Sequence, residues 1–448
     1  MRLLKKLVGR IAFITAGLIL IAALIPGLAQ ATPYDTFGVG ARAIAMGGAY
    51  GAVGGDSAAC YYNIATLTNA GPFQIEFDYH RADIDIRFND RRSAVDPDKG
   101  FRFGLVLGKT FFHRRFRFGA TMYTPDQHFM RFVLPPRTGP IIVRYNNVNH
   151  MQAAITGLAG QVFSWWSLGI GATFVSDHVG GVDFSIAEDE PAEGDLKSKL
   201  GSKSKVVAGT FFKPLSWLGL GISYREQNQQ KMHLPTKISM SDLRVLEENG
   251  IILFHNGRIV AELNSHSHFS PEQYQFAVSF KAIDRLLFAA DATHYKYSKM
   301  KYNMAYSVAT MEGDLGTVLS TMPAPPIPEP GLKDVWGYAF GLEGTLIDRD
   351  DFRVSLRGGY NFRATPVPEQ TGLANSVDSD THVFSAGLGV TFNPFPKVLR
   401  KPMSIDVFEQ HHYITPRIMH KDDPTNDAGD YEYKGSANSL GASWTIRF

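Results

Sequence analysis

Most of the chain after Gln74 alternates between apolar residues and small or polar ones with a period of two. The clearest example is the C-terminal segment, where Leu440, Ala442, Trp444, Ile446 and Phe448 alternate with Ser, Gly, Ser, Thr and Arg. Because successive side chains of a β-strand point to opposite faces, this pattern predicts strands with one apolar and one polar face. A soluble β-sandwich would alternate in the same way, so alternation alone leaves soluble and membrane folds open.

The connections between the predicted strands decide between these folds. We expect strands near residues 72–86, 100–111, 115–123, 149–163, 166–178, 204–213, 216–234, 270–282, 285–298, 334–346, 351–365, 381–393, 402–415 and 438–448. Tight turns are expected at His113-Arg114, Ser164-Trp165, Lys213-Pro214-Leu215, Ile283-Asp284 and Ile347-Asp348-Arg349-Asp350, whereas the alternate connections are much longer. Short turns at one end, long loops at the other and an even number of strands are typical of bacterial outer-membrane barrels. The sequence therefore predicts an all-β fold, a fourteen-stranded antiparallel transmembrane β-barrel at residues 72–448.

Residues 1–31 have the features of a secretory signal peptide. A basic start up to Arg10 precedes the apolar run Ile11–Ile25, and Ala29-Gln30-Ala31 forms an A-x-A pattern. We expect cleavage after Ala31. An uncleaved anchor helix is the alternative, although the apolar run is shorter than the roughly 20 residues that a membrane span needs.

Composition and motifs exclude several classes of function. Lys and Arg total 45 against 43 Asp and Glu, which gives no basic excess for binding nucleic acid. The chain has a single cysteine, so it can form neither an intrachain disulfide nor a cysteine-based zinc site. His411 and His412 are adjacent, and adjacent strand residues face opposite sides, which argues against a shared metal ion. No hydrolase, zinc-protease or phosphate-binding motif is found, so we expect neither an enzyme nor a cofactor.

The segment at residues 32–71 does not alternate and is rich in small residues. It contains Gly47-Gly48 and, further on, Tyr62-Asn63-Ile64-Ala65-Thr66-Leu67. Small residues allow backbone segments to pack closely in a confined space. We therefore expect residues 32–71 to fold inside the barrel as an N-terminal hatch, or plug.

This segment resembles the hatch of the FadL/TodX family of outer-membrane transporters for hydrophobic compounds. The family has a Tyr-Asn-Pro-Ala-Gly-Leu box, in which Ile64 here replaces the proline and Thr66 the glycine. Thr365–Glu369 and Asp378–His382 resemble the family's late signature, and Ser270–Ser298 resembles one of its strand pairs. The resemblance implies a fourteen-stranded barrel gated by its hatch, with Gly47, Gly48, Tyr62, Asn63 and Ala65 as hatch-motif residues.

Two sets of residues are candidates for contacting a ligand. Several predicted long loops contain apolar stretches, and exposed apolar patches usually mark binding sites. The candidates for an extracellular loop groove are Phe129, Phe132, Leu134, Leu253 and Phe254. The alternative, compatible with a groove, is that these loops pack on each other as a lid. Arginines that the alternation places inward are candidates for meeting a fatty-acid carboxylate, or else lumen arginines that are solvated or ion-paired: Arg102, Arg117, Arg353, Arg357 and Arg447.

These observations predict passive uptake of hydrophobic small molecules, such as long-chain fatty acids or aromatic hydrocarbons, across a Gram-negative outer membrane. The resemblance implies capture in the loop groove, entry into the lumen and release by hatch movement. The alternative is an outer-membrane scaffold that uses the same fold to dock protein partners. We expect a monomer whose partners are its hydrophobic ligand, outer-membrane lipid and lipopolysaccharide, and the barrel-assembly machinery during biogenesis.

Overall fold

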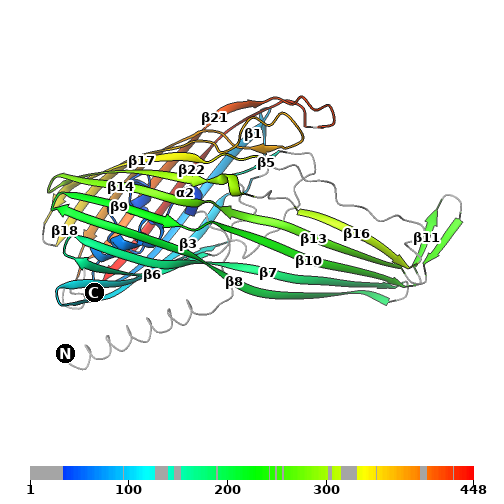
Figure 1. Cartoon of the computed structure of the whole chain (residues 1–448), viewed down its shortest axis with the longest axis horizontal. Helices are drawn as coiled ribbons and strands as arrows, with labels where there is room; N and C mark the ends of the chain where they lie inside the picture. Colours follow the sequence, from blue (N-terminus) through cyan, green and yellow to red (C-terminus); the bar gives the residue numbers. More distant parts are fainter. Residues whose placement is uncertain are drawn as a thin grey trace, which may run out of the picture.

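A closed β-barrel forms the body of the protein (Figure 1). The computed structural model describes residues 34–93, 95–126, 140–145, 153–187, 190–241, 243–247, 250–254, 257–300, 305–313, 330–349, 351–393, 401–426 and 428–448. In order around the barrel the strands are β1 (Phe73–Phe88), β3 (Asp98–Phe111), β4 (Arg114–Pro125), β6 (Ala153–Phe163), β7 (Trp166–Ala187), β8 (Glu190–Leu215), β9 (Leu218–Arg225), β14 (Glu272–Ile283), β15 (Leu286–Lys296), β17 (Val335–Asp348), β18 (Phe352–Arg363), β20 (Thr381–Phe392), β21 (Met403–Met419) and β22 (Tyr431–Arg447). Neighbours pair antiparallel and β22 closes onto β1. The predicted fourteen-stranded antiparallel barrel is confirmed.

Several of the predicted strand limits are wrong: β7 ends at Ala187, β8 begins at Glu190 and β22 begins at Tyr431, so these strands are longer than expected. The turn expected at Lys213-Pro214-Leu215 lies two residues later, because β8 continues to Leu215 through a register shift after Phe212. A bulge of this kind accommodates the missing N–H of Pro214. The strand expected at 216–234 stops at Arg225, because the chain then leaves the barrel wall as β10 (Asn228–Ser241).

The region expected to be a long loop after β9 is largely strand. β10 pairs parallel with the far end of β7 and antiparallel with β13 (Gly257–Ser270), which in turn pairs with β16 (Ala305–Gly313). Together with the distal parts of β7 and β8, these strands form a sheet that projects beyond the barrel (Figure 1). The hairpin of β11 (Leu243–Glu247) and β12 (Gly250–Phe254) lies at its tip. Among the described residues no helix is long and apolar enough to cross a membrane.

The outer face of the barrel is apolar. Along β17, for example, Trp336, Phe340 and Leu342 are 41%, 52% and 40% exposed, although each is a large hydrophobic residue. The same holds for one face of most other barrel strands, as expected for a surface that lies against lipid. On β15 the outward positions include Phe288 and Ala290.

The N-terminal segment lies inside the barrel. It consists of α2 (Tyr34–Phe37), α3 (Ala41–Ala45), α4 (Ala59–Tyr62) and the 3₁₀ helix η1 (Ile64–Asn69), drawn in blue in Figure 1. Its buried side chains form one hydrophobic cluster with inward residues of the wall, including Val106, Ile155 and Val207. The predicted signal peptide, residues 1–31, lies outside the described residues.

A second hydrophobic cluster lies among the inward faces of β1, β21 and β22 and the loops beside them. It joins Ile84, Ile414 and Tyr433 of the strands to Tyr145 and Val377 of the loops. The loops contribute the short strands β5 (Ile141–Ile142) and β19 (Ser376–Val377), which pair parallel with each other. The remaining short elements are β2 (Arg91–Arg92) and the 3₁₀ helix η3 (Tyr297–Lys299).

Candidate functional site

The backbone of the hatch lies directly against the backbone of one part of the wall. Gly47 has a φ of 66°, and a Cβ atom built there would lie 2.7 Å from the amide nitrogen of Tyr360. A Cβ atom on Gly359 of β18 would lie 2.0 Å from the amide nitrogen of Gly47. Only glycine permits so close an approach. Asn361 completes the contact, because its side-chain amide donates to the carbonyl of Gly47 at 3.0 Å.

Elsewhere, wall side chains hold the main chain of the hatch. The carboxylate of Asp291 accepts hydrogen bonds from the backbone N–H groups of Tyr50 and Gly51 at 2.9 and 2.8 Å. Other wall residues donate to hatch carbonyls: Ser223 to Tyr62 at 2.7 Å, Arg225 to Tyr61 at 2.6 Å, Ser279 to Ala52 at 2.8 Å, Arg363 to Thr36 at 2.6 Å and Arg117 to Ala70 at 3.0 Å. These bonds fix the path of the hatch backbone from several strands at once.

The Tyr62–Leu67 box forms an anchor. The Asn63 side chain caps η1 by accepting from the Ala65 N–H at 3.1 Å and donates to the carbonyl of Thr210 in the wall at 3.0 Å. The Tyr62 hydroxyl accepts from the Val39 N–H at 3.1 Å. The side chain of Ile64, at the position of the family proline, packs directly against the backbone of three wall glycines: Gly157, Gly169 and Gly171. A Cβ atom at any of the three would collide with Ile64. The box thus fixes the hatch to β6–β8.

The five arginine candidates do not gather at one site, and two of them form ion pairs with carboxylates inside the barrel. Arg102 is 5% exposed and bonds Glu76 at 2.8 Å as well as Asp78. Arg357 bonds Glu343 and Asp406, each at 2.6 Å. Glu343 also binds Arg42 of the hatch at 2.7 Å. This buried network joins the hatch to β17, β18 and β21.

The other three candidates lie elsewhere. Arg117 is buried and donates to three carbonyls, those of Ala70, Lys109 and Phe116. Arg353 is exposed next to Asp348, beside the turn between β17 and β18. Arg447, the further inward arginine, donates to Ser404 at 2.6 Å.

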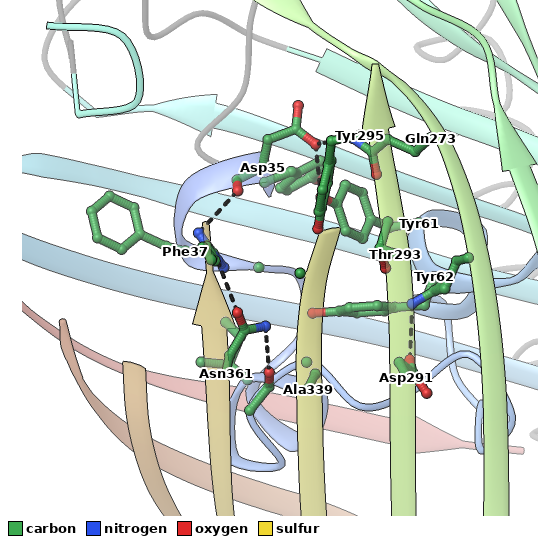
Figure 2. A pocket seen from close by; sticks show the side chains of 18 of the residues that line it. Asp35, Phe37, Tyr61, Tyr62, Gln273, Asp291, Thr293, Tyr295, Ala339 and Asn361 are labelled. Atoms are coloured by element: carbon green, nitrogen blue, oxygen red, sulfur yellow. Dashed lines mark hydrogen bonds between the residues drawn. The ribbon is translucent and has the colours of Figure 1, made fainter. Parts of the chain in front are cut away.

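A cavity of about 50 Å³ lies between the hatch and strands β9, β14, β15, β17 and β18 (Figure 2). Its lining is aromatic and polar: Tyr34, Phe37, Tyr61, Tyr62, Tyr295, Arg225, Gln273, Asp291 and Asn361 are among its residues. The Arg225 guanidinium lies over the Tyr61 ring, 3.7 Å from its centroid, and binds the Asp35 carboxylate at 3.1 Å.

The volume of the cavity limits what it can hold. One ordered water needs about 10–15 Å³ and benzene occupies an engineered cavity of about 150 Å³, so the space suits a few waters. A larger ligand requires the hatch to shift.

Loops held by a buried ion pair cover the second cluster. Arg144 binds Asp378 at 2.7 Å and donates to the carbonyl of Ser379 at 2.6 Å. The hydroxyl of Thr365 donates to the same carboxylate at 2.9 Å. Burial raises the pKa of Asp378, and the attraction of Arg144 opposes this rise. Thr365, Asp378 and Ser379 all belong to the segments that resemble the family's late signature. We call residues 140–145 and 364–380 the lid.

The loop-groove candidates are only partly placed. Phe129, Phe132 and Leu134 lie outside the described residues. Leu253 and Phe254 lie in β12, at the tip of the projecting sheet, paired with Arg244 and Leu243.

The histidine pair divides between the two faces of β21. His412 is fully buried and bonds the Tyr145 hydroxyl at 2.8 Å, whereas His411 bonds Asn438 in an exposed position. Within the described ranges no group of three or more His, Cys, Asp or Glu residues is arranged to hold a metal ion.

Sequence reasoning missed the polar residues that line the cavity. Asp291 is the clearest, because an acid in the run Ala289-Ala290-Asp291-Ala292 is unusual in a strand between two apolar surfaces. Arg225 gave no such signal, since it stands where the chain leaves the barrel wall.

Solved structures with the same architecture decide the fold. A FadL homologue from Pseudomonas aeruginosa superposes with a TM-score of 0.56 at 16% identity, covering 94% of this chain and 99% of that one. The chain has the FadL/TodX-type fold. The monoaromatic hydrocarbon channel CymD gives a TM-score of 0.54 at 13% identity over 92% of this chain and 97% of its own. The Pseudomonas putida toluene transporter TodX gives 0.54 at 14% identity over 92% and 99%. No protein-family model and no curated protein matches the sequence.

Proposed function

We propose that this FadL/TodX-type barrel takes up hydrophobic small molecules, such as long-chain fatty acids or aromatic hydrocarbons, passively across a Gram-negative outer membrane. The single observation that carries the proposal is the hatch, which fills the lumen of a lipid-facing barrel but leaves a cavity against one wall. The names of the similar structures, a toluene transporter and a monoaromatic hydrocarbon channel, support this class of substrate. On this proposal the chain is no enzyme.

The proposed route begins at the extracellular loops, where Phe129, Phe132, Leu134, Leu253 and Phe254 form an apolar groove. The ligand then passes the lid and reaches the hatch cavity, where the hatch shifts to let it through. A polar group on the ligand meets Arg363, which lines the cavity and donates to an amide oxygen and to carbonyls. Arg225 also lines the cavity, but the Asp35 carboxylate binds it. Arg102 and Arg357 are less suitable partners, because protein carboxylates already neutralise them.

The proposal extends to the rest of the chain. The segment 1–31 is the signal peptide, removed after Ala31, and residues 32–71 form the hatch domain. The mature protein acts as a monomer in contact with outer-membrane lipid and lipopolysaccharide, after insertion by the barrel-assembly machinery.

Ligand binding to the purified barrel tests this function. We expect saturable binding of a fluorescent long-chain fatty acid or of radiolabelled toluene. Changing Phe132 and Phe254 together to Ser should weaken binding about tenfold or more, if each loss of apolar contact costs about 1–2 kcal/mol.

The matched control is Phe112→Ser, because Phe112 is 96% exposed in the turn between β3 and β4, at the opposite end of the barrel from the projecting sheet. This variant should bind as tightly as the unmodified protein. Heat-modifiability on gels checks that each barrel is intact. Absence of saturable binding to both ligands would favour the scaffold function instead.

A further inference from the structure

A second cavity opens on the outer surface of the barrel. Its volume is about 320 Å³, and it lies on β14, β15, β17 and β18. Its rim consists of large apolar side chains that are about half exposed, among them Phe280, Phe288 and Phe340. Its depth comes from two small outward residues, Ala290 and Gly358. No side chain in the lining is ionisable, so the cavity can recognise only hydrocarbon.

The cavity lies halfway up the lipid-facing wall. The outward positions of β17 run from Trp336 through Phe340 and Leu342 to Leu346, and the cavity is formed at the two central ones. The apolar band of such barrels is about 25 Å tall. The cavity is therefore open to the hydrocarbon interior of the bilayer rather than to water or to lipid head groups.

Gly358 shows that the space is not needed for packing within the protein. A Cβ atom at Gly358 would meet one neighbour within 4 Å, the carbonyl oxygen of Ser385 at 4.0 Å. The adjacent Gly359 is different, because the hatch presses directly on it. Glycine weakens a strand, and no described atom of a non-adjacent residue lies closer than 4.0 Å to where a Cβ atom at position 358 would be, so the space is available to something outside the chain.

We propose that this cavity is a seat for one acyl chain of an outer-membrane lipid. The seat belongs to the lipid-facing surface, so a lipid chain is the occupant with direct access to it. The inward face of β17 contacts the hatch behind the seat. A Cβ atom on Gly341, which lines the seat, would lie 2.6 Å from the carbonyl oxygen of Met46. A chain held in the seat therefore supports the wall directly behind the hatch. The proposal does not depend on what the barrel transports.

Photo-crosslinking tests the seat. The full mature protein is reconstituted in vesicles of phosphatidylethanolamine and phosphatidylglycerol that contain phosphatidylethanolamine with a mid-chain diazirine. After irradiation, mass spectrometry locates the labelled peptides. We expect the peptides containing Phe280, Phe288 and Phe340 to be labelled more than lipid-facing peptides of β4 and β6 at the same depth.

Gly358→Leu fills the seat and should lower this labelling about tenfold, the factor that corresponds to losing contact with about two methylene groups. Gly344→Leu is the matched control. Gly344 is also an outward glycine, but it does not line the seat. A Cβ atom added there would have Leu286 as its nearest neighbour, at 3.9 Å. Labelling of the seat peptides in Gly344→Leu should therefore equal that in the unmodified protein. Equal labelling around the barrel, or unchanged labelling in Gly358→Leu, would overturn the proposal.

A third arm separates lipid from transported ligand. Free long-chain fatty acid should lower the labelling no more than the same mole fraction of unlabelled phospholipid does, whereas stronger displacement would assign the cavity to the transported molecule instead. Failure of fatty-acid binding in the transport assay would leave this result unaffected.

Discussion

The hatch and the lid each contain an arginine–carboxylate pair, partly buried in the hatch and buried in the lid, and the surroundings of the two pairs differ. In the hatch, Glu343 is shared between Arg42 and the wall residue Arg357. In the lid, Arg144 is the cation paired with Asp378. The hatch main chain is bound by side chains of many wall strands. The lid main chain is bound mainly from one side, by Arg417 of β21 and by Lys421, and its two loops meet through β5 and β19. Both parts are thus held by several hydrogen bonds, but Glu343 has two arginine partners in the hatch network whereas Asp378 has one in the lid.

The difference indicates how each part can move. Releasing the lid requires the loss of the Arg144–Asp378 ion pair and of the hydrogen bonds that Arg417 and Lys421 donate to lid carbonyls. Releasing the hatch requires several bonds to break on different strands, so movement of one short part, such as α3, costs less than movement of the whole segment. The same type of substitution should therefore have unequal effects in the two regions.

The largest effect is expected from Arg144→Met in the lid. This change leaves the Asp378 carboxylate buried without its cation, which costs about 3–5 kcal/mol. The cost is local, so the barrel should remain folded while the part of the lid around Asp378 loosens. Hydrogen exchange at residues 364–380 should become faster by a large factor. Unchanged exchange there would show that the ion pair does not hold the lid.

A smaller but clear effect is expected from Gly359→Leu at the hatch contact. The new side chain would collide with the backbone of Gly47, and overpacking of this kind costs about 1–3 kcal/mol. Limited proteolysis should cut the hatch faster, and denaturant should unfold the barrel at a lower concentration. Gly358→Leu is the matched control, because it adds the same side chain one residue away on the outer face. Equal effects of the two changes would contradict the close hatch contact.

The smallest effect is expected from Arg42→Met in the hatch, below about 1.5 kcal/mol. Arg357 remains within 2.6 Å of Glu343, so the carboxylate keeps a cation after Arg42 is lost. Proteolysis of the hatch should therefore change much less than in Gly359→Leu. A loss of stability as large as that of Arg144→Met in the lid would show that the hatch lacks the redundancy described above.

The fold was predictable because each barrel strand carries its own signal. Alternation identified the strands, and the density of small residues identified the hatch. The projecting sheet was not predictable, since β10 pairs parallel with the distal part of β7, a partner that no local pattern indicates. Strand order in such a region is decided by tertiary contacts rather than by periodicity.

The site was predictable to a lesser degree. Alternation placed Arg102 and Arg357 on the lumen side, yet each stands directly opposite an acid on the neighbouring strand, Asp78 and Glu343. Cross-strand neighbours of this kind are known only once the register is known. The contacts between wall side chains and hatch backbone leave no trace in the hatch sequence, which is why the role of Asp291 was missed.

The hydrogen bonds from wall side chains to main-chain groups of the hatch affect how freely the hatch sequence can change in evolution. A carbonyl or an amide N–H is present whatever the residue, so the hatch can accept substitutions at many positions without losing its bonds to the wall. The exceptions are positions where the backbone itself touches, such as Gly47. Selection on this segment therefore acts on chain path more than on residue identity, and a plug can keep its place in a barrel long after its sequence has ceased to be recognisable.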